Sequence, residues 1–446
     1  MSPVSDIKDL IAIPTSAEEL GIPISLITDL VYRMLFNEGD VSVSRFTEII
    51  RIHPQVVDDM LARMQQEHLV EVARTGTLGR LSYTYRLTEE GGKRARDAME
   101  KSLYVGAAPV DVEVYKKAIV AQTSSTLKIT PTQVKKALSH LILPERFDRR
   151  IGPAVNAGSS LFLYGPPGNG KTTVAEAIAK LMSGASPIWI PYAITIGGQI
   201  IQIFDPLIHK PAGDLAFKQE TANLGKVKTD RRWGLFERPA VMVGGELQME
   251  SLDLRYEPYA KFYEAPLQLK ANGGMFLIDD FGRQQMSPQQ LLNRWIVPLE
   301  SRIDFLRLQS GQTIEAPFRQ LLVFSTNLDP EQLVDDAFLR RIQMKVGVFS
   351  PDEKMFFQIF KVMSDSLRVP LDKNGFLYLI QKWYREPGRT MQAVHPRDIL
   401  KIIVSICTYE GVPPVLSPEL IDEACTSYFV DKKGKGMGDY KAMTNM

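Results

Sequence analysis

Cysteine is scarce in this chain of 446 residues, where only Cys407 and Cys425 occur. Two cysteines are too few for a disulfide framework, and they lack the CxxC or Cys/His spacing of a zinc site. We therefore expect two reduced thiols in the protein core. At roughly 100 to 200 residues per domain, the length predicts two to four domains.

Long apolar runs are also missing. The most apolar stretch, residues 188–204, is interrupted by proline, glycine and glutamine and is too short to span a bilayer. The first residues include Asp6 and Asp9 and contain no apolar segment of the kind that a secretory signal needs. The sequence therefore predicts a cytoplasmic protein that does not insert into membranes.

An excess of one charge is absent too, because 53 Lys and Arg face 52 Asp and Glu, a net of +1. The balance hides an uneven distribution. Residues 1–100 contain 11 basic and 16 acidic side chains, a net of −5, and the remainder carries +6. The first hundred residues therefore form a distinct, acidic unit.

Within this unit, residues 21–104 contain three helical patterns and then two alternating ones. The helices are predicted at 24–37, 42–50 and 54–68. Apolar and polar residues alternate on either side of Gly76 and Gly79, which predicts a β-hairpin. Three helices followed by a hairpin resemble a winged helix-turn-helix domain.

Such a domain usually suggests DNA binding, which requires basic or amide side chains on the third helix. Here that helix offers Asp58, Asp59 and Glu67, and the unit as a whole is acidic. We therefore expect the domain to bind a protein. DNA binding stays open as the alternative because of three arginines on the predicted wing, Arg74, Arg80 and Arg86.

The rest of the chain changes character twice. An α/β alternation gives way to four helical patterns and then to a lysine- and glycine-rich end. The predicted divisions are an N-terminal segment at 1–20, the winged-helix domain at 21–104, a linker at 105–130, an α/β core at 131–349, a helical lid at 350–430 and a flexible tail at 431–446.

The strongest motif begins where an apolar strand, 161–164, ends. The next nine residues match GxxxxGK[ST] at every defined position and lead into an amphipathic helix, which is the context of a phosphate-binding P-loop. Backbone N–H groups of such a loop and the helix N-terminus face phosphate, the lysine reaches the β- and γ-phosphates, and the hydroxyl binds Mg²⁺. The predicted nucleotide-binding residues are Gly165, Pro166, Pro167, Gly168, Asn169, Gly170, Lys171, Thr172 and Thr173, with Thr172 as a metal ligand.

Polar residues end two further apolar strands. Asp279 and Asp280 follow the run 274–278, and Asn327 ends the run 321–326. We expect Asp279 to bind Mg²⁺ and Asp280 to orient the attacking water, with Asn327 helping to hold that water.

Three arginines complete the predicted site. Arg340 and Arg341 end a short helix, where they are either solvated surface charges or the finger that completes a neighbour's site. Arg397 opens a helix of the predicted lid and is expected to fold back on the γ-phosphate. His395 beside it is expected to be a helix-start residue without a ligand role.

Taken in order, GPPGNGKT, the Asp279–Asp280 strand, Asn327, Arg340/Arg341 and Arg397 resemble the AAA+ ATPases over residues 130–430. The resemblance implies a five-stranded parallel sheet in the order 5-1-4-3-2 with a helical lid. It also implies a ring, often a hexamer, with ATP at the subunit interfaces. Residues 303–315 read as a hairpin before the Asn327 strand and resemble the pre-sensor 1 hairpin group, which includes the MoxR-like chaperone ATPases.

Two features depart from a minimal core of that family. Lys171 and Asp279 are far apart in the sequence, which predicts an insertion between the second core strand and the Asp279 strand. Asp280 stands where the family has glutamate, one methylene longer. Because a misplacement of about 1 Å at a catalytic group can cost about a hundredfold in rate, turnover is expected to be slow.

The sequence therefore predicts an ATPase that uses Mg²⁺ and ATP, forms a homo-oligomeric ring and remodels or assembles a protein client recruited partly by the winged helix. Two other functions stay open. One is a DNA-associated factor of the same family, and the other is a slow, ATP-switched scaffold.

Overall fold

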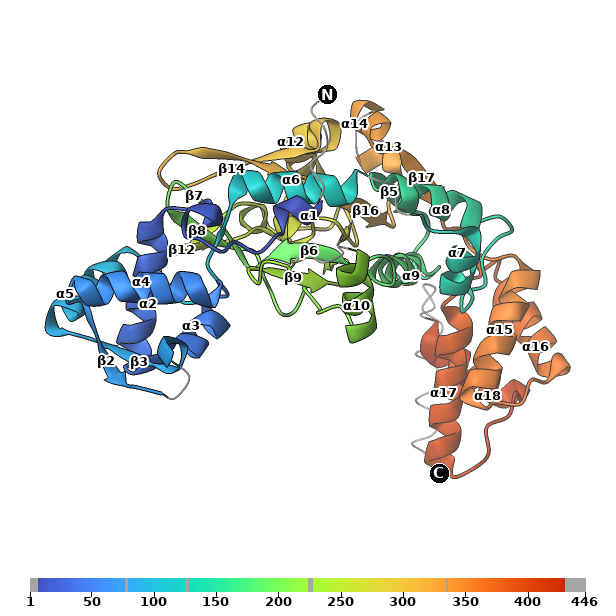
Figure 1. Cartoon of the computed structure of the whole chain (residues 1–446). Coiled ribbons are helices and arrows are strands. Elements are labelled where there is room, and N and C mark those ends of the chain that lie inside the picture. The colour runs from blue at the N-terminus through green and yellow to red at the C-terminus, as the bar shows by residue number, and fades with distance from the viewer. Residues whose placement is uncertain (1–6, 77–78, 125–127, 224–227, 334–335, 430–446) are drawn as a thin grey trace, which may run out of the picture.

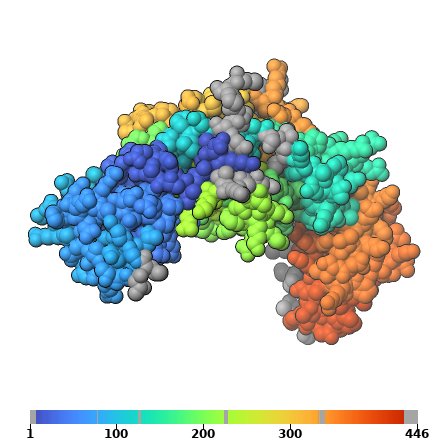
Figure 2. Space-filling view, in the orientation of Figure 1, coloured from blue at the N-terminus to red at the C-terminus, as the bar shows by residue number. Residues whose placement is uncertain are grey.

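The computed structural model of the chain describes residues 7–76, 79–124, 128–223, 228–333 and 336–429. Figure 1 shows three parts: an N-terminal unit (residues 16–104), an α/β body (105–349) and a C-terminal bundle (350–429). The N-terminal unit and the C-terminal bundle lie at opposite ends of the body, which gives the molecule the outline of an arch (Figure 2).

The body is built on a central sheet of five parallel strands in the order β10-β13-β16-β5-β17. Counted along the chain, this is the order 5-1-4-3-2 that the resemblance implied, so the expected α/β fold with a parallel sheet is confirmed. The strands are short apolar runs, as expected when helices cover both faces of a sheet. They are β5 (Ser160–Tyr164), β10 (Ala240–Val243), β13 (Met275–Ile278), β16 (Leu321–Thr326) and β17 (Met344–Gly347).

Helices pack on the two faces of this sheet through separate apolar cores. One core joins the strands to three helices, α7 (Pro131–Leu138), α8 (Asp148–Ala157) and α9 (Lys171–Ser183). On the other face, Trp295 of α12 (Pro288–Ser301) packs against Phe276 and Phe324 of the sheet. The carboxyl ends of the strands stay uncovered by these helices and carry the polar residues of the predicted site.

A second sheet, which we call the insertion sheet, lies between the central sheet and the N-terminal unit (Figure 1). Its order is β11-β12-β8-β7-β4, and a two-stranded ribbon of β6 and β9 lies beside it. The strands are β4 (Val110–Asp111), β6 (Ile188–Pro191), β7 (Ala193–Ile196), β8 (Gln199–Gln202), β9 (Trp233–Phe236), β11 (Arg255–Glu257) and β12 (Phe262–Glu264).

This sheet corrects two expectations. The inserted residues lie on both sides of the second core strand β10, because the run 240–243 pairs with β13. Residues 188–239 come before β10, and residues 244–274, which include β11 and β12, come after it as predicted. The predicted linker, 105–130, also contributes structure. It supplies strand β4 and helix α6 (Val112–Thr123), whose Val112, Tyr115 and Ile119 are buried in the same core as the insertion.

The N-terminal unit contains the three predicted helices and two strands that pair as predicted. Its elements are α2 (Ile24–Glu38), β1 (Val41–Ser42), α3 (Val43–Ile49), α4 (Pro54–Gln66), β2 (Val70–Arg74), β3 (Thr84–Leu87) and α5 (Glu89–Lys101). Helix α5 was not predicted, because its buried face consists only of Gly91, Ala95 and Ala98 and gives no apolar signal.

The N-terminal unit packs directly on the insertion sheet. Arg51 lies over the Tyr192 ring at 4.1 Å from its centroid, and the Leu103 N–H donates to Ala260 O at 2.8 Å. Ala193 and Ile200 of the insertion sheet belong to the apolar core of the unit. The unit is therefore attached to the body by an extensive interface as well as by the chain.

The C-terminal bundle contains the four predicted helices, α15 (Glu353–Leu367), α16 (Lys373–Ile380), α17 (His395–Glu410) and α18 (Pro418–Tyr428). Cys407 and Cys425 are free and buried in its core, as expected. The predicted tail, 431–446, lies outside the described residues. Among the helices that the structure describes, none is long and apolar enough to cross a membrane.

The remaining elements include an antiparallel hairpin of β14 (Ile303–Arg307) and β15 (Thr313–Pro317), which directly precedes β16 as predicted. Short helices complete the chain: α1 (Ile7–Leu10), α10 (Asp214–Asn223), α11 (Leu267–Lys270), α13 (Pro330–Leu333) and α14 (Asp336–Arg341).

Candidate active site

The P-loop connects the carboxyl end of β5 to the first residue of α9. Gly165, Gly168 and Gly170 all have positive φ, at 132°, 72° and 88°, a region that L side chains rarely adopt. A Cβ on Gly165 would also collide with the Val348 carbonyl oxygen. The glycines of the motif are thus required by the backbone itself, and they leave three positions of the loop without a side chain.

Lys171 is 6% exposed and is held by this loop. Its Nζ donates to Gly165 O and Pro166 O, both at 2.8 Å. Burial lowers the pKa of Lys171, and the carboxylates of Asp279 and Asp280 oppose the shift. The ammonium group is therefore already positioned at the loop, with two acids close enough to act on its charge.

Thr172 and Asp279 meet as the sequence predicted. The Thr172 hydroxyl donates to Asp279 Oδ2 at 2.7 Å, across 107 residues of sequence. The backbone of Asp279 is held by β10, because the Asp279 N–H donates to Val243 O at 2.8 Å. A hydroxyl and a carboxylate side by side are two oxygen ligands of the kind that Mg²⁺ takes in phosphate sites.

Asp280 and Asn327 also meet. Asn327 Nδ2 donates to Asp280 Oδ1 at 2.8 Å, which joins the ends of β13 and β16. Asp280 has φ of 48°, an uncommon conformation for a residue other than glycine. Strained backbone of this kind is often found at functional sites, where the surrounding structure maintains it.

Gln284 helps to maintain that conformation and was not predicted. Its Oε1 accepts from the Gly282 N–H at 2.8 Å, and its Nε2 donates to Asp279 O at 2.9 Å and Asp280 O at 3.2 Å. One amide thus bonds to both acidic residues and to the turn after them. A single glutamine in a loop has no sequence pattern that would have revealed this role.

Asn169 links the P-loop to the C-terminal bundle. It is buried, its Nδ2 donates to Ser350 Oγ at 3.2 Å, and its Oδ1 accepts from the Ala393 N–H at 3.1 Å. The Val394 N–H donates to Gly168 O at 2.9 Å. The loop is therefore bonded to the segment that leads into α17.

A cavity of about 390 Å³ is lined by the P-loop residues 167–173 together with Asp279, Asp280, Asn327 and Arg397. Arg397 is half exposed, and its Nε donates to Asp398 Oδ1 at 2.9 Å. Of the predicted nucleotide site, the structure thus brings together residues 167–173 of the loop, two strand ends and the bundle, whereas Gly165 and Pro166 do not line the cavity. His395 is buried at the start of α17, with Nδ1 at 3.0 Å from the Tyr384 hydroxyl, and does not line the cavity.

The other wall of the cavity is apolar and was missed from the sequence. It is formed by Leu141, Ile142 and Leu143 of the loop before α8, by Ile359, Val362 and Met363 of α15, and by Val394 just before α17. His140 lies at the rim of this wall. Apolar residues in a loop show no periodic pattern. The sequence therefore predicted no contact for the flat, apolar part of a ligand.

Arg340 and Arg341 do not line this cavity. Arg341 Nε donates to Glu300 Oε1 of α12 at 2.6 Å, and Arg340 is exposed. The two adjacent arginines therefore differ, because one is engaged within its own chain and the other faces solvent.

Two of the three arginines on the predicted wing, Arg80 and Arg86, pair with carboxylates of the N-terminal unit. Arg80 pairs with Asp58 at 3.1 Å, and Arg86 lies 3.4 Å from Asp40 and 3.8 Å from Glu71. Asp58 belongs to α4, the helix that would enter a DNA groove. These pairs leave the wing with less free positive charge than its sequence suggested.

Comparisons with known proteins agree with the loop geometry. The family described as "ATPase family associated with various cellular activities (AAA)" matches residues 161–205, which contain β5, the P-loop and α9. Residues 161–205 are thus of the AAA type. A family described only as a domain of unknown function, DUF8689, matches residues 352–427 in the bundle.

The similar proteins extend over different shares of the chain. A vesicle-fusing ATPase of Dictyostelium discoideum is 40% identical over 53 residues, which is 12% of this chain and 7% of that protein. A RuvB mutant from Thermotoga maritima aligns at 15% identity and a TM-score of 0.36, covering 66% of this chain and 69% of its own. NtrX from Brucella abortus, solved with ATP, aligns at 12% identity and a TM-score of 0.38, covering 71% and 58%.

Proposed function

We propose that the chain is an AAA+ ATPase that binds Mg-ATP in the cavity below the bundle and hydrolyses it. The observation that supports this most is the convergence of five residues from one helix and two strand ends on a single cavity: Lys171, Thr172, Asp279, Asp280 and Asn327. Each carries the functional group that phosphoryl transfer to water requires.

The residues fit a nucleotide and its metal. The P-loop backbone is open because glycines occupy its positive-φ positions, and the apolar wall at Leu141–Leu143 and α15 suits a base. Thr172 and Asp279 would hold Mg²⁺, which supplies charge neutralisation on the phosphates when bound. In the described part of the chain no three Asp, Glu, His or Cys form a metal cluster of their own, in keeping with the few protein ligands that Mg²⁺ uses in phosphate sites.

Asp280 is proposed to orient the attacking water and accept its proton, although it is shorter than the glutamate of the family. Its carboxylate is held by the Asn327 amide, and its backbone by Gln284. These contacts fix the direction in which the shorter side chain points. They support slow but real turnover, in preference to an ATP-switched scaffold.

Arg340 is proposed to act on the site of a neighbouring subunit. It is exposed and lies away from its own cavity, as a finger supplied in trans must be, whereas Arg341 is paired with Glu300. This role requires a homo-oligomeric ring, which we propose to be a hexamer. The β14–β15 hairpin supports a place in the MoxR-like group.

The N-terminal unit is proposed to be a winged helix that recruits a protein client, in a cytoplasmic remodelling or assembly process. Its acidic net charge and the Arg80–Asp58 and Arg86–Asp40 pairs support a protein over DNA. Retention of residues 1–349 on a DNA column in low salt would favour the DNA-associated alternative.

Release of phosphate from ATP by the full chain in Mg²⁺ tests the proposal. We expect measurable turnover, a loss of about 10²- to 10⁴-fold in Asp280→Asn, and no change in Asp97→Asn, which removes an exposed carboxylate in α5. No turnover by the wild type, or equal turnover in Asp280→Asn, would contradict it.

A further inference from the structure

A second cavity, of about 330 Å³, lies at the opposite end of the central sheet. Its lining includes residues that lie one or two positions before four strands: Gly158 before β5, Arg238 before β10, Gly274 before β13 and Arg319 before β16. The end of α6 forms another wall. Three of the lining residues are arginines, Arg238, Arg302 and Arg319, and none is acidic.

Arg238 is the most deeply buried of the three, at 6% exposed. Its Nε donates to Ser186 O at 2.9 Å, and its two terminal nitrogens bond to Ser186 Oγ and Gly273 O. Burial lowers the pKa of Arg238 to about 10. At neutral pH it therefore stays charged, with backbone carbonyls and a hydroxyl as its partners.

Arg302 and Arg319 are less satisfied. Arg302 donates one bond, to Gly158 O at 3.0 Å. The Nε of Arg319 is buried and has no hydrogen-bond partner within the described structure. Burial lowers the pKa of both side chains, and for Arg302 the charge of Arg319 adds to the effect, because like charges disfavour one another.

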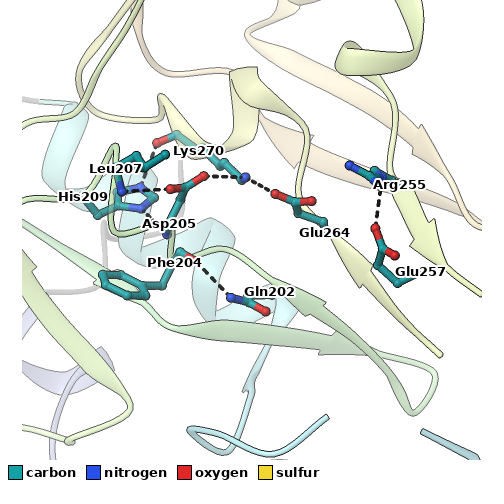
Figure 3. Close-up of polar contacts among 9 residues, drawn as sticks. All are labelled: Gln202, Phe204, Asp205, Leu207, His209, Arg255, Glu257, Glu264 and Lys270. Atoms are coloured by element: carbon teal, nitrogen blue, oxygen red, sulfur yellow. Dashed lines mark hydrogen bonds and ion pairs between the residues drawn. The ribbon is translucent and has the colours of Figure 1, made fainter. Parts of the chain in front are cut away.

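Two other buried cations of the body, Lys270 and Arg232, are paired with carboxylates, unlike these three arginines. Figure 3 shows Lys270, whose Nζ donates to Asp205 Oδ2 at 2.9 Å and also to Glu264. Arg232 pairs with Asp230 at 2.8 Å. The fold thus supplies acids to these two buried cations, as desolvated charges generally require.

Hydrogen bonds to backbone carbonyls satisfy only some of the donors of the three arginines. They account for Arg238 and for one bond of Arg302, but they provide nothing for Arg319 Nε. The neutral polar side chains of the cavity are already used: Gln122 bonds to Trp189, Asn156 to Ile129, and Thr123 to Ile119 O. Free hydrogen-bond donors therefore come mainly from the guanidinium groups.

We propose that this cavity is a binding site for a small anion that carries phosphate groups, with Arg302 and Arg319 as its principal contacts. Planar guanidinium groups bind phosphate oxygens in pairs of hydrogen bonds, and the cavity volume is at the lower limit of small-molecule sites. The site is separate from the P-loop and does not rest on the hydrolysis of ATP. A ligand here would bridge α6 and the core sheet.

Isothermal titration with inorganic pyrophosphate tests the site, using the full chain with Lys171→Ala so that the P-loop contributes little. We expect binding in this background, and at least tenfold weaker binding when Arg319→Gln or Arg302→Gln is added, since each removes charge-assisted bonds. Arg255→Gln, an exposed arginine paired with Glu257 in the insertion sheet, is the matched control and should leave the affinity unchanged.

Competition identifies the source of the phosphate. If nucleotides are the ligands, ATP should displace pyrophosphate from the Lys171→Ala protein, and AMP should do so less well. If free pyrophosphate is the ligand, neither should compete at equal concentration. Arg319→Lys, which keeps the charge, should restore part of the affinity and replaces Arg319→Gln if that variant does not fold. Absence of binding in the Lys171→Ala protein, or an equal loss in Arg255→Gln, would overturn the proposal.

Discussion

The central sheet carries acids and amides at the carboxyl ends of its strands and arginines at the amino ends. At the carboxyl ends, Lys171 is held by loop carbonyls, Thr172 bonds to Asp279 and Asn327 bonds to Asp280. At the amino ends, Arg302 and Arg319 line one cavity whose described lining contains no carboxylate. The same strands therefore carry two sites of opposite electrostatic character.

The two ends of the strands differ in how far their polar groups depend on a ligand for their hydrogen bonds. The polar groups at the carboxyl ends bond to other groups of the chain, so each of them has a partner within the protein. At the amino ends, Arg319 Nε has no such partner within the described structure, and an anion would complete its hydrogen bonding. Substitutions at the two ends should therefore have different effects.

The largest effect is expected at neither end but at Arg340. If this exposed arginine serves the carboxyl-end site of a neighbour, Arg340→Ala should lower ATP turnover about 10³- to 10⁵-fold. Arg341→Ala should cost much less, because Arg341 is paired with Glu300 in its own chain. Turnover per protomer measured across a concentration series provides the check, and it should rise with concentration as rings form. A rate that is flat across the range of assembly would contradict the trans role.

Protonation of His209 at low pH is expected to lower the stability of the fold by a large amount. His209 lies beside Lys270 and its partners Asp205 and Glu264 (Figure 3). Its Nδ1 accepts from the Asp205 N–H, its other nitrogen bonds Lys270 O, and burial lowers the pKa of His209 to about 4. The unfolded chain takes up this proton near pH 6.5, so stability falls between about pH 6.5 and 4, by about 3 kcal/mol in all.

Urea unfolding of the body at pH 7.5 and 4.5 measures this loss. His209→Gln should reduce the difference between the two pH values, and His68→Asn, at an exposed histidine of the N-terminal unit, should not. An unchanged difference in His209→Gln would show that another group governs the acid response.

A smaller effect on the free energy of unfolding should distinguish Lys270, which is paired with carboxylates, from Arg319, for which the structure describes no carboxylate partner. Lys270→Met leaves Asp205 and Glu264 without their partner, and because both carboxylates are partly exposed we expect a cost of about 2 to 3 kcal/mol. Arg319→Gln removes a charge that repels Arg302, so its cost should stay within about 1 kcal/mol. Urea unfolding of both variants is the measurement. Equal losses would mean that Arg319 has partners as effective as those of Lys270.

The smallest effect is expected at Gln284, which holds the backbone of the two acids. Gln284→Ala should lower turnover about tenfold by releasing the strained conformation of Asp280, with little change in Mg-ATP affinity. Gln285→Ala is the matched control, because Gln285 is the adjacent residue, is exposed and bonds only to Gln248 among the contacts described. A loss of affinity without a loss of rate would assign Gln284 to binding instead.

The sequence predicted the parts of the molecule that are local in the chain. The P-loop is contiguous, and Asp279, Asp280 and Asn327 could be placed because each ends an apolar run that had to be a buried strand. Parallel strands bring their carboxyl ends to one edge, so the meeting of these residues followed from the fold class.

The parts that depend on distant partners could not be predicted. Val110 pairs with Ile194, so a segment that looked like a linker is a strand of the insertion sheet. The bonds from Asn169 to Ser350 and Ala393 join residues more than 180 positions apart. Arg238, Arg302 and Arg319 are isolated in the sequence, and only the packing of strand starts brings them together.

The most direct test of the account is the affinity for Mg-ATP, measured by titration calorimetry with the full chain. We predict that Lys171→Ala weakens binding about 10- to 100-fold, because it removes a charge-assisted contact to phosphate. Lys180→Ala, an exposed lysine on the same helix, should bind as the wild type does. Equal binding by wild type and Lys171→Ala would show that the P-loop at the carboxyl end is not the nucleotide site.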